Sequence, residues 1–291
     1  MEMSLFPPIP SPPLADLQPV CLDSCMGTQK HGAGFTLIET AIVIAIVALV
    51  LGSIFIGKDV IKAAVLRATI HDIGQLNRAV STFRTKYAGL PGDLAPARAV
   101  AFDFPAEGEG RNGRAGRGDG NGRIEGCTAN ATALGCETAL FWVDLSAADL
   151  IPPRLSTYTA SSAFVANATT PSRVADYLPK QKLRDTVFLH AYPHRGQNYF
   201  FLGSATAVTD GMLALDNGAT SEEAHALDTK FDDSQPTHGD VQAITALGVV
   251  DTGKRTGEDR CVDATVSPAR YELAEPTLTH VNCMLQLRAT Y

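Results

Sequence analysis

The sequence lacks the short motifs that carry catalysis in many enzymes. It contains no Gly-x-Ser-x-Gly element, no phosphate-binding glycine loop ending in Lys-Ser or Lys-Thr, and no His-Glu-x-x-His pair. His190 and His194 are four residues apart, but Pro193 excludes the helix that would place both on one face, so no zinc site is expected. We therefore predict that the protein is not an enzyme and requires no cofactor.

The chain also lacks an excess of positive charge. Its 31 acidic and 24 basic residues give a net charge of −7, which argues against a general nucleic-acid surface. Four arginines gather in the Gly-rich stretch 107–126, but this stretch has no aromatic side chains on which bases could stack. We therefore expect no nucleic-acid partner and interpret residues 107–126 as a flexible solvated loop.

Charge is missing altogether between Thr40 and Gly57. With residues 35–39, which precede this run, the apolar segment comprises residues 35–57. It is longer than the roughly 20 residues that a helix needs to span a bilayer. Glu39 is its one charged residue, and a carboxylate inside a spanning helix costs on the order of a few kcal/mol, so it usually marks function. We predict that residues 35–57 form the transmembrane half of a long N-terminal helix.

Residues 58–88 continue this helix with a different character. Core-type side chains recur there every three or four positions, with charged residues between them, which predicts an amphipathic half packed on a globular domain. The recurring positions are Ile61, Val65, Thr69, Ile73, Leu76, Val80, Phe83 and Tyr87. Gly89 and Pro91 are expected to end the helix.

The segment Gly34-Phe35-Thr36-Leu37-Ile38-Glu39 resembles the cleavage and methylation signal of type IV pilins and type II secretion pseudopilins. In that family Gly precedes the cut, Phe is the first mature residue and Glu is the fifth. The resemblance implies that a prepilin peptidase cuts between Gly34 and Phe35 and that the new amine of Phe35 is N-methylated. It also implies that Glu39 pairs with the Phe35 ammonium of a neighbouring subunit and sets the register of assembly, since a buried carboxylate needs a partner.

The same resemblance implies a fold, a function and a location. The fold is the α+β type IV pilin-like fold, in which the long N-terminal helix packs on a small antiparallel β-sheet head. The function is that of a structural subunit of a pilus or pseudopilus, serving adhesion, motility, DNA uptake or protein secretion. Its partners are other pilin subunits, the prepilin peptidase and the inner-membrane assembly platform.

The implied location is the bacterial inner membrane. One helix crosses it, with the N-terminus in the cytoplasm and the head in the periplasm, before the subunit joins a pilus or pseudopilus at the cell surface. Two alternatives stay open: a membrane-anchored, exported binding or adhesin module with an uncleaved signal anchor, and a hydrolase tethered by the same helix. The sequence does not separate a major pilin from a minor pilin or a secretion pseudopilin.

Residues 1–34 form the predicted leader. Residues 1–25 are rich in proline and are expected to be disordered. Met26 is a second possible start, which would leave a short basic leader of residues 26–34. Lys30 would hold that end in the cytoplasm.

Residues 89–291 form the predicted head domain. It contains four cysteines, an even number in the part expected to be exported. Of the three possible connectivities, the simplest is local: Cys127 with Cys136 and Cys261 with Cys283.

Local patterns predict several elements of the head. Residues 186–192 and 198–202 are strand-like, with a turn at 193–197, and residues 281–287 alternate like a last strand. Residues 221–229 are expected to form a helix with Ser221 as its N-cap.

Two acidic segments are candidate calcium sites. Leu90-Pro91-Gly92-Asp93 and the Gly-Asp-Gly-Asn-Gly segment at 118–122 resemble turns of a subset of bacterial pilin-like proteins. Within and after the second, the oxygen-bearing residues Asp119, Asn121 and Glu125 have the odd spacing with which calcium loops begin. The second candidate set comprises Asp228, Asp232 and Asp233. The resemblance supports it, because some pseudopilins use calcium in their C-terminal region. The alternative is that both sets are ordinary turn residues.

Overall fold

The structure is a computed structural model of the whole chain and describes residues 36–106, 108–152, 155, 157–255, 257–274 and 280–291. The predicted leader and Phe35 lie outside the described residues. The chain divides into two compact units, residues 1–54 and residues 55–291. Helix α1 (Leu37–Tyr87) contributes residues to both.

In the first unit, α1 presents an almost unbroken apolar surface. Every described side chain from Thr36 to Ile54 is exposed. Two hydroxyls bond within the helix: Thr40 Oγ1 donates to the Leu37 carbonyl at 3.0 Å and Ser53 Oγ to the Val50 carbonyl at 2.8 Å. By length and composition α1 can cross a membrane, and internal bonding of hydroxyls suits an apolar environment.

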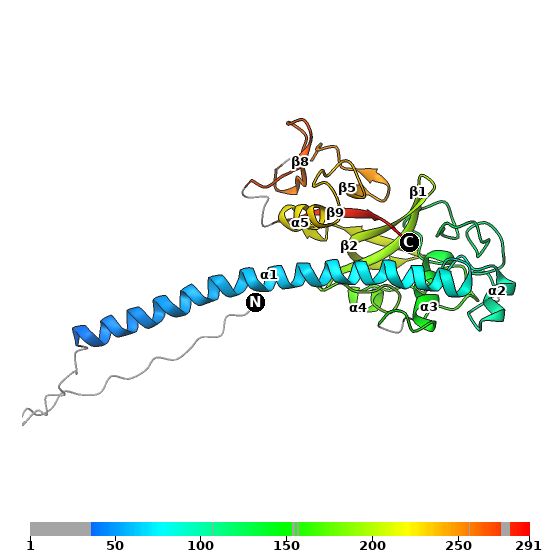
Figure 1. Cartoon of the computed structure of the whole chain (residues 1–291), viewed down its shortest axis with the longest axis horizontal. Coiled ribbons are helices and arrows are strands. Elements are labelled where there is room, and N and C mark those ends of the chain that lie inside the picture. Colours follow the sequence, from blue (N-terminus) through cyan, green and yellow to red (C-terminus); the bar gives the residue numbers. More distant parts are fainter. Residues whose placement is uncertain (1–35, 107, 153–154, 156, 256, 275–279) are drawn as a thin grey trace, which may run out of the picture. The chain divides into compact units, whose positions relative to one another are not determined.

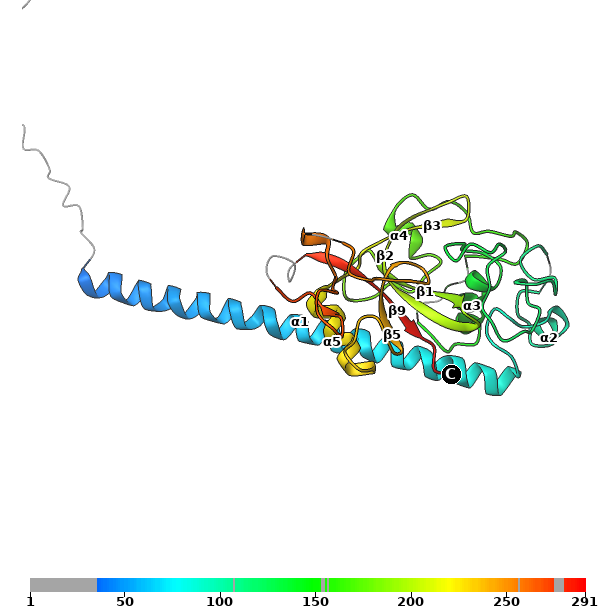
Figure 2. The same cartoon turned by 90° about the horizontal axis from the view of Figure 1, so that it is seen from above.

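In the second unit, α1 packs along the β-sheet (Figures 1 and 2). Its buried stripe has alternating spacings of four and three residues, which keeps it on one side of the helix. The stripe consists of Thr69, Ile73, Leu76, Val80, Phe83 and Tyr87. The predicted stripe began too early, because Ile61 is 64% exposed and Val65 only half-buried.

The end of α1 lies within one residue of the predicted boundary, but the residue that terminates the helix is not the predicted Gly89. The helix ends at Tyr87, and Ala88, with φ 52°, takes the left-handed conformation that terminates it, one residue before Gly89. The guanidinium of Arg98 donates to the Tyr87 carbonyl at 3.4 Å and also to that of Ala88. A side-chain cation therefore satisfies the last carbonyls of the helix, where it also complements the helix dipole.

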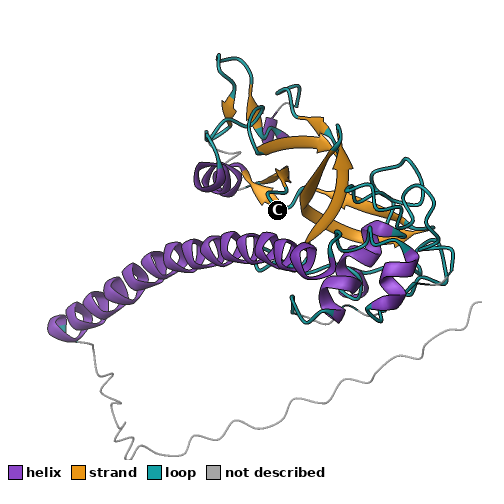
Figure 3. Ribbon diagram, turned by 45° about the vertical axis from the view of Figure 1, so that its right-hand side comes forward, coloured by secondary structure: helices purple, strands orange, loops and turns teal. Residues whose placement is uncertain are grey.

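The head is built on an antiparallel sheet, drawn in orange in Figure 3. Its main path has the order β1-β2-β9-β5-β6; β3 also pairs with β2, and β4 with β9. The strands are β1 (Val187–His194), β2 (Gln197–Thr209), β3 (Met212–Asp216), β4 (Ala219–Thr220), β5 (Val241–Ala246), β6 (Val249–Val250) and β9 (Val281–Arg288). A separate pair comprises β7 (Val262–Asp263) and β8 (Arg270–Tyr271).

Short helices complete the head: α2 (Pro96–Ala101), α3 (Glu137–Ala147), α4 (Pro171–Val174), α5 (Ser221–Phe231) and the 3-10 turn η1 (Gly257–Asp259). A long N-terminal helix followed by an antiparallel sheet confirms the predicted α+β architecture.

Successive side chains of a strand point to opposite faces of the sheet, so the buried side chains form one cluster on each face. Phe200 and Leu202 of β2 join the main cluster, which also contains the α1 stripe. Phe201, between them, joins a smaller cluster with Ile244 and Met284. The sheet is thus buried on both faces, and α1 packs on only one of them.

The β1–β2 hairpin is tighter than predicted. Its turn is Arg195-Gly196, with φ of 49° and 79°, and His194 pairs with Gln197. Two left-handed residues give the turn type that suits a two-residue hairpin. Pro193 lies inside β1 rather than in the turn, which is tolerated because β1 is at one end of the strand order.

The N-cap of α5 is Thr220 and not the predicted Ser221. Thr220 Oγ1 accepts from the backbone N–H of Glu223 at 3.2 Å, and the Glu223 carboxylate accepts from the Thr220 N–H at 2.8 Å. This reciprocal capping box satisfies two helix-end donors. Ser221 is instead buried, with Oγ 3.0 Å from Asn282 Oδ1.

Two disulfides staple the head, Cys127–Cys136 and Cys261–Cys283. These are the two local pairs. The second ties the segment before β7 to the central strand β9, which restricts a region with little regular structure of its own.

His190 of β1 makes the stability of the head depend on pH. The ring is fully buried, and its Nε2 lies 3.1 Å from the carbonyl of Ala131, which can only accept. Burial lowers the pKa of His190 from 6.5 to about 4. The folded protein therefore binds this proton less tightly than the unfolded chain, so stability is fully present above pH 6.5 and falls as the pH drops toward 4.

We expect His190 to contribute a loss of about 2–3 kcal/mol in the free energy of unfolding between pH 7 and pH 4.5. Urea unfolding of the full chain in detergent at both pH values measures it. His190→Gln keeps a donor for the Ala131 carbonyl but cannot titrate, so the difference between wild type and variant isolates this residue from the carboxylates. Equal pH dependence in the two proteins would contradict the prediction.

Candidate functional site

The turn after α1 is held by two buried carboxylates, Asp93 and Glu137. Asp93 accepts from the backbone N–H groups of Gly120 and Gly122, both at 2.7 Å. Glu137, the first residue of α3, accepts from those of Gly118 at 2.7 Å and Glu125 at 2.8 Å. Each carboxylate oxygen thus binds one N–H of segment 118–125, and the two side chains hold that segment against the turn. Sequence reasoning noted Asp93 within a turn motif but missed its role and that of Glu137.

The turn requires glycine at position 92. Its φ is 80°, and a Cβ at this position would lie 2.4 Å from the carbonyl oxygen of Glu137. Both the left-handed backbone and the close approach to α3 exclude a side chain.

Asp93 and Glu137, with the nearby Asp119, form a carboxylate cluster in which two pKa values are raised. Burial raises the pKa of Asp93 to about 6 and that of Glu137 to about 8. The backbone donors oppose the rise, while Asp119 adds repulsion to both. Oxygen atoms of Asp93, Asp119 and Glu137 lie within 4.8 Å of one another.

The predicted calcium set Asp119, Asn121 and Glu125 is adjacent to this cluster. The Asn121 amide donates to Asp119 at 2.9 Å and to Glu125 at 3.1 Å. Arg123 forms an ion pair with Glu125 at 2.5 Å. These donors already neutralise or bond the carboxylates, and calcium at this set stays a prediction.

The second predicted calcium set is brought together by the fold. Oxygen atoms of Asp228, Asp232 and Asp233 lie within 4.8 Å of one another, at the C-terminal end of α5. Burial raises the pKa of Asp228 to about 6. Asp228 accepts from Tyr271 Oη at 2.9 Å. Hard oxygen donors of this kind suit calcium, and calcium at this set also stays a prediction.

The Gly- and Arg-rich stretch is not the flexible solvated loop that was predicted. Arg111 and Asp144 form an ion pair at 2.5 Å in which both side chains are 0% exposed. Asp144 also accepts from the Gly92 N–H at 2.8 Å, and Arg111 donates to the Pro105 carbonyl at 2.5 Å. Burial raises the pKa of Asp144, and the guanidinium of Arg111 opposes that rise. The stretch is therefore anchored in the core by one of its arginines.

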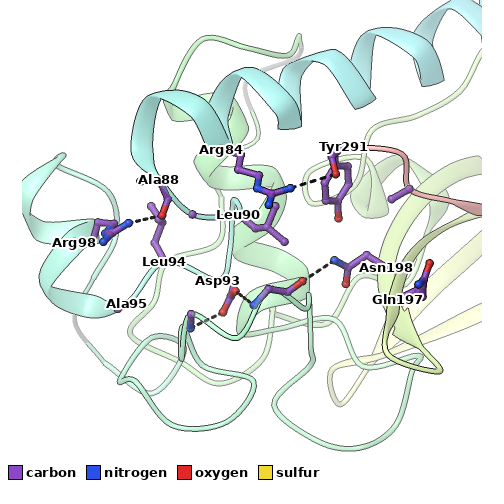
Figure 4. A pocket seen from close by; sticks show the side chains of 14 residues that line it. Arg84, Ala88, Leu90, Asp93, Leu94, Ala95, Arg98, Gln197, Asn198 and Tyr291 are labelled. Carbon is purple, nitrogen blue, oxygen red and sulfur yellow. Dashed lines mark hydrogen bonds between the residues drawn. The ribbon is translucent and has the colours of Figure 1, made fainter.

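A pocket of about 610 Å³ lies beside this turn (Figure 4). Three of its polar side chains bond to other parts of the head. Arg98 holds the end of α1, Arg84 donates to the Tyr291 carbonyl at 3.5 Å, and Asn198 donates to the Gly122 carbonyl at 3.0 Å. These contacts connect the end of α1, the 118–125 segment and the last residues of the head.

The start of α1 forms a second site. Thr36 Oγ1 accepts from the Glu39 N–H at 3.2 Å, and the Glu39 carboxylate accepts from the Thr36 N–H at 3.4 Å. This is a capping box, which satisfies donors that a helix start otherwise leaves free. Glu39 is exposed here, and its negative charge suits the positive end of the helix dipole.

Residues 29–55 match a family model described as the prokaryotic N-terminal methylation motif. The chain carries a prepilin-type methylation signal. That signal is typical of type IV pilins and pseudopilins, and proteins that carry it are typically structural rather than enzymatic. No curated protein and no solved structure matches the chain.

The methylation signal overlaps the capping box and the apolar part of α1. Of the processing residues predicted from the sequence, Gly34 and Phe35 lie outside the described residues, and Glu39 lies in the first turn of the helix. The methylation signal is therefore joined directly to a helix with the length and composition of a membrane span.

Proposed function

We propose that the protein is a pilin-like structural subunit that assembles into a pilus or pseudopilus filament. The observation that carries this proposal is the methylation signal at residues 29–55, continued by an exposed apolar helix and followed by an α+β head. An apolar helix surface of this size must be covered by membrane or by other helices. A filament core made of such helices covers it in the assembled state.

In this proposal the prepilin peptidase cuts between Gly34 and Phe35 and the Phe35 amine is methylated. Glu39 then pairs with the Phe35 ammonium of a neighbouring subunit. Pairing in an apolar core is favourable for both charges, because either one alone carries a large desolvation cost. Residues 35–57 cross the bacterial inner membrane before assembly, with the head in the periplasm and afterwards at the cell surface.

N-terminal mass spectrometry of the protein from membranes and from sheared surface material tests the processing step. We expect the mature chain to begin at Phe35 and to carry one N-methyl group. Gly34→Leu should block the cut, because a large side chain then precedes the scissile bond, and it should leave the leader attached. Wild-type protein that keeps residues upstream of Phe35 would overturn the proposal and favour an anchored binding module.

A further inference from the structure

The head carries an exposed apolar segment close to the end of α1. Val100 is 60% exposed and Phe102 46% exposed, and Ala101 and Asp103 beside them are exposed as well. We call residues 100–103 the knob. The Phe102 ring packs edge-on against the Tyr87 ring at 5.0 Å between centroids, so the knob is fixed at the level of the last turn of α1 (Figures 1 and 2 show α2 there).

A separate part of the head contains an apolar pocket of about 360 Å³. Leu76 of α1, Trp142 of α3, Leu189 of β1 and the pair Leu150-Ile151 line it. We call it the α1–α3 pocket. Two polar atoms on its lining residues, Trp142 Nε1 and Gln181 Oε1, are buried and have no hydrogen-bond partner among the described residues.

The rim of the α1–α3 pocket is cationic. Lys180 and Lys182 lie on it, against the one carboxylate of Asp72. Lys180 forms an ion pair with Asp185 at 2.6 Å. Lys182 is exposed and makes no ion pair within the described part of the head, so it is available to a partner.

We propose that the knob of one subunit inserts into the α1–α3 pocket of a neighbouring copy, with Asp103 meeting Lys182. The apolar side chains of the knob match the apolar walls, and its acid matches the cationic rim. The knob also carries backbone carbonyls, such as that of Phe102, that can accept from the Trp142 indole N–H; the N–H groups of Phe102 and Asp103 already donate to the Ala99 and Val100 carbonyls. This inference rests on the proposed function and names one contact of the filament.

The placement of the two surfaces is compatible with a filament. The pocket contacts α1 at Leu76 and the knob contacts it at Tyr87, so they are displaced by about 16 Å along the helix axis. Two different surfaces that meet head to tail form a heterologous contact, which repeats in an open helical array unless it closes into a ring. Each subunit can thus place its knob in the pocket of one neighbour and receive the knob of another neighbour in its own pocket.

Lys182→Glu in the full chain tests the proposed contact. We expect filament yield to fall at least about tenfold, because two carboxylates then face each other across the contact. Adding Asp103→Asn should restore most of the yield; Asp103 has φ 60°, which Asn tolerates. Arg114→Glu, on the exposed part of the Gly-rich stretch, is the matched control and should leave the yield unchanged.

Crosslinking gives an independent readout. With Ala101→Cys and Lys182→Cys in one chain, a short bis-maleimide should convert filaments into covalent ladders, while either single variant should give none. Wild-type filaments together with no ladder and a normal yield for Lys182→Glu would overturn the contact but leave the proposed function standing. Wild-type protein that forms no filament in its native host would overturn both.

Discussion

Glu39→Ala is expected to abolish filament assembly while leaving the head folded. In the assembled core the Phe35 ammonium would lose its partner, and an uncompensated buried charge costs about 3–5 kcal/mol. That cost applies to every subunit added, so the affinity of each addition falls on the order of 10²–10⁴-fold. The measurement is the amount of sheared surface filament per cell, compared with the amount of subunit in the membrane.

Two variants separate this charge from the capping box that Glu39 forms with Thr36. Glu39→Gln keeps a side chain that can cap the helix but has no charge, and it should fail to assemble. Thr36→Ala removes the hydroxyl of the cap and keeps the carboxylate, so it should assemble. If Glu39→Gln assembled normally, the ammonium pairing would be wrong and the residue would act only through the helix start.

The long helix and the strands of the hairpin were predictable because their signals are local. The charge-free run and the three-to-four-residue spacing mark α1, and alternation marks β1 and β2. The errors occurred where distant contacts decide the outcome. Arg98, eleven residues after Tyr87, bonds the last carbonyls of α1, and no local rule would reveal it.

The candidate sites show the same contrast between local signals, which the sequence reveals, and distant contacts, which it does not. The methylation signal is a contiguous motif and was identified from its residues. The carboxylate cluster joins Asp93, Asp119 and Glu137, which belong to three separate segments, so spacing indicated only the middle one. Arg111 looked like one of several solvated arginines, because its partner Asp144 is far away in the sequence and only the fold brings them together.

Arg111→Met is the change in the head with the largest expected effect on stability. It would leave the carboxylate of Asp144 buried without its cation, and breaking a buried pair in this way costs about 3–5 kcal/mol. For a domain of this size such a loss lowers the melting temperature by roughly 6–20 °C. Thermal unfolding of the full chain in detergent, followed by near-UV circular dichroism, measures the change.

Arg114→Met is the matched control, since Arg114 lies in the same Gly-rich stretch but is exposed, and its effect should stay within about 0.5 kcal/mol. The double variant Arg111→Met/Asp144→Leu should recover part of the loss, because no unpaired charge stays in the core. The Gly92 N–H would then lose its acceptor, so recovery should be incomplete. Equal melting temperatures for Arg111→Met and Arg114→Met would show that the stretch is solvated, as the sequence alone suggested, and that the ion pair does not anchor it.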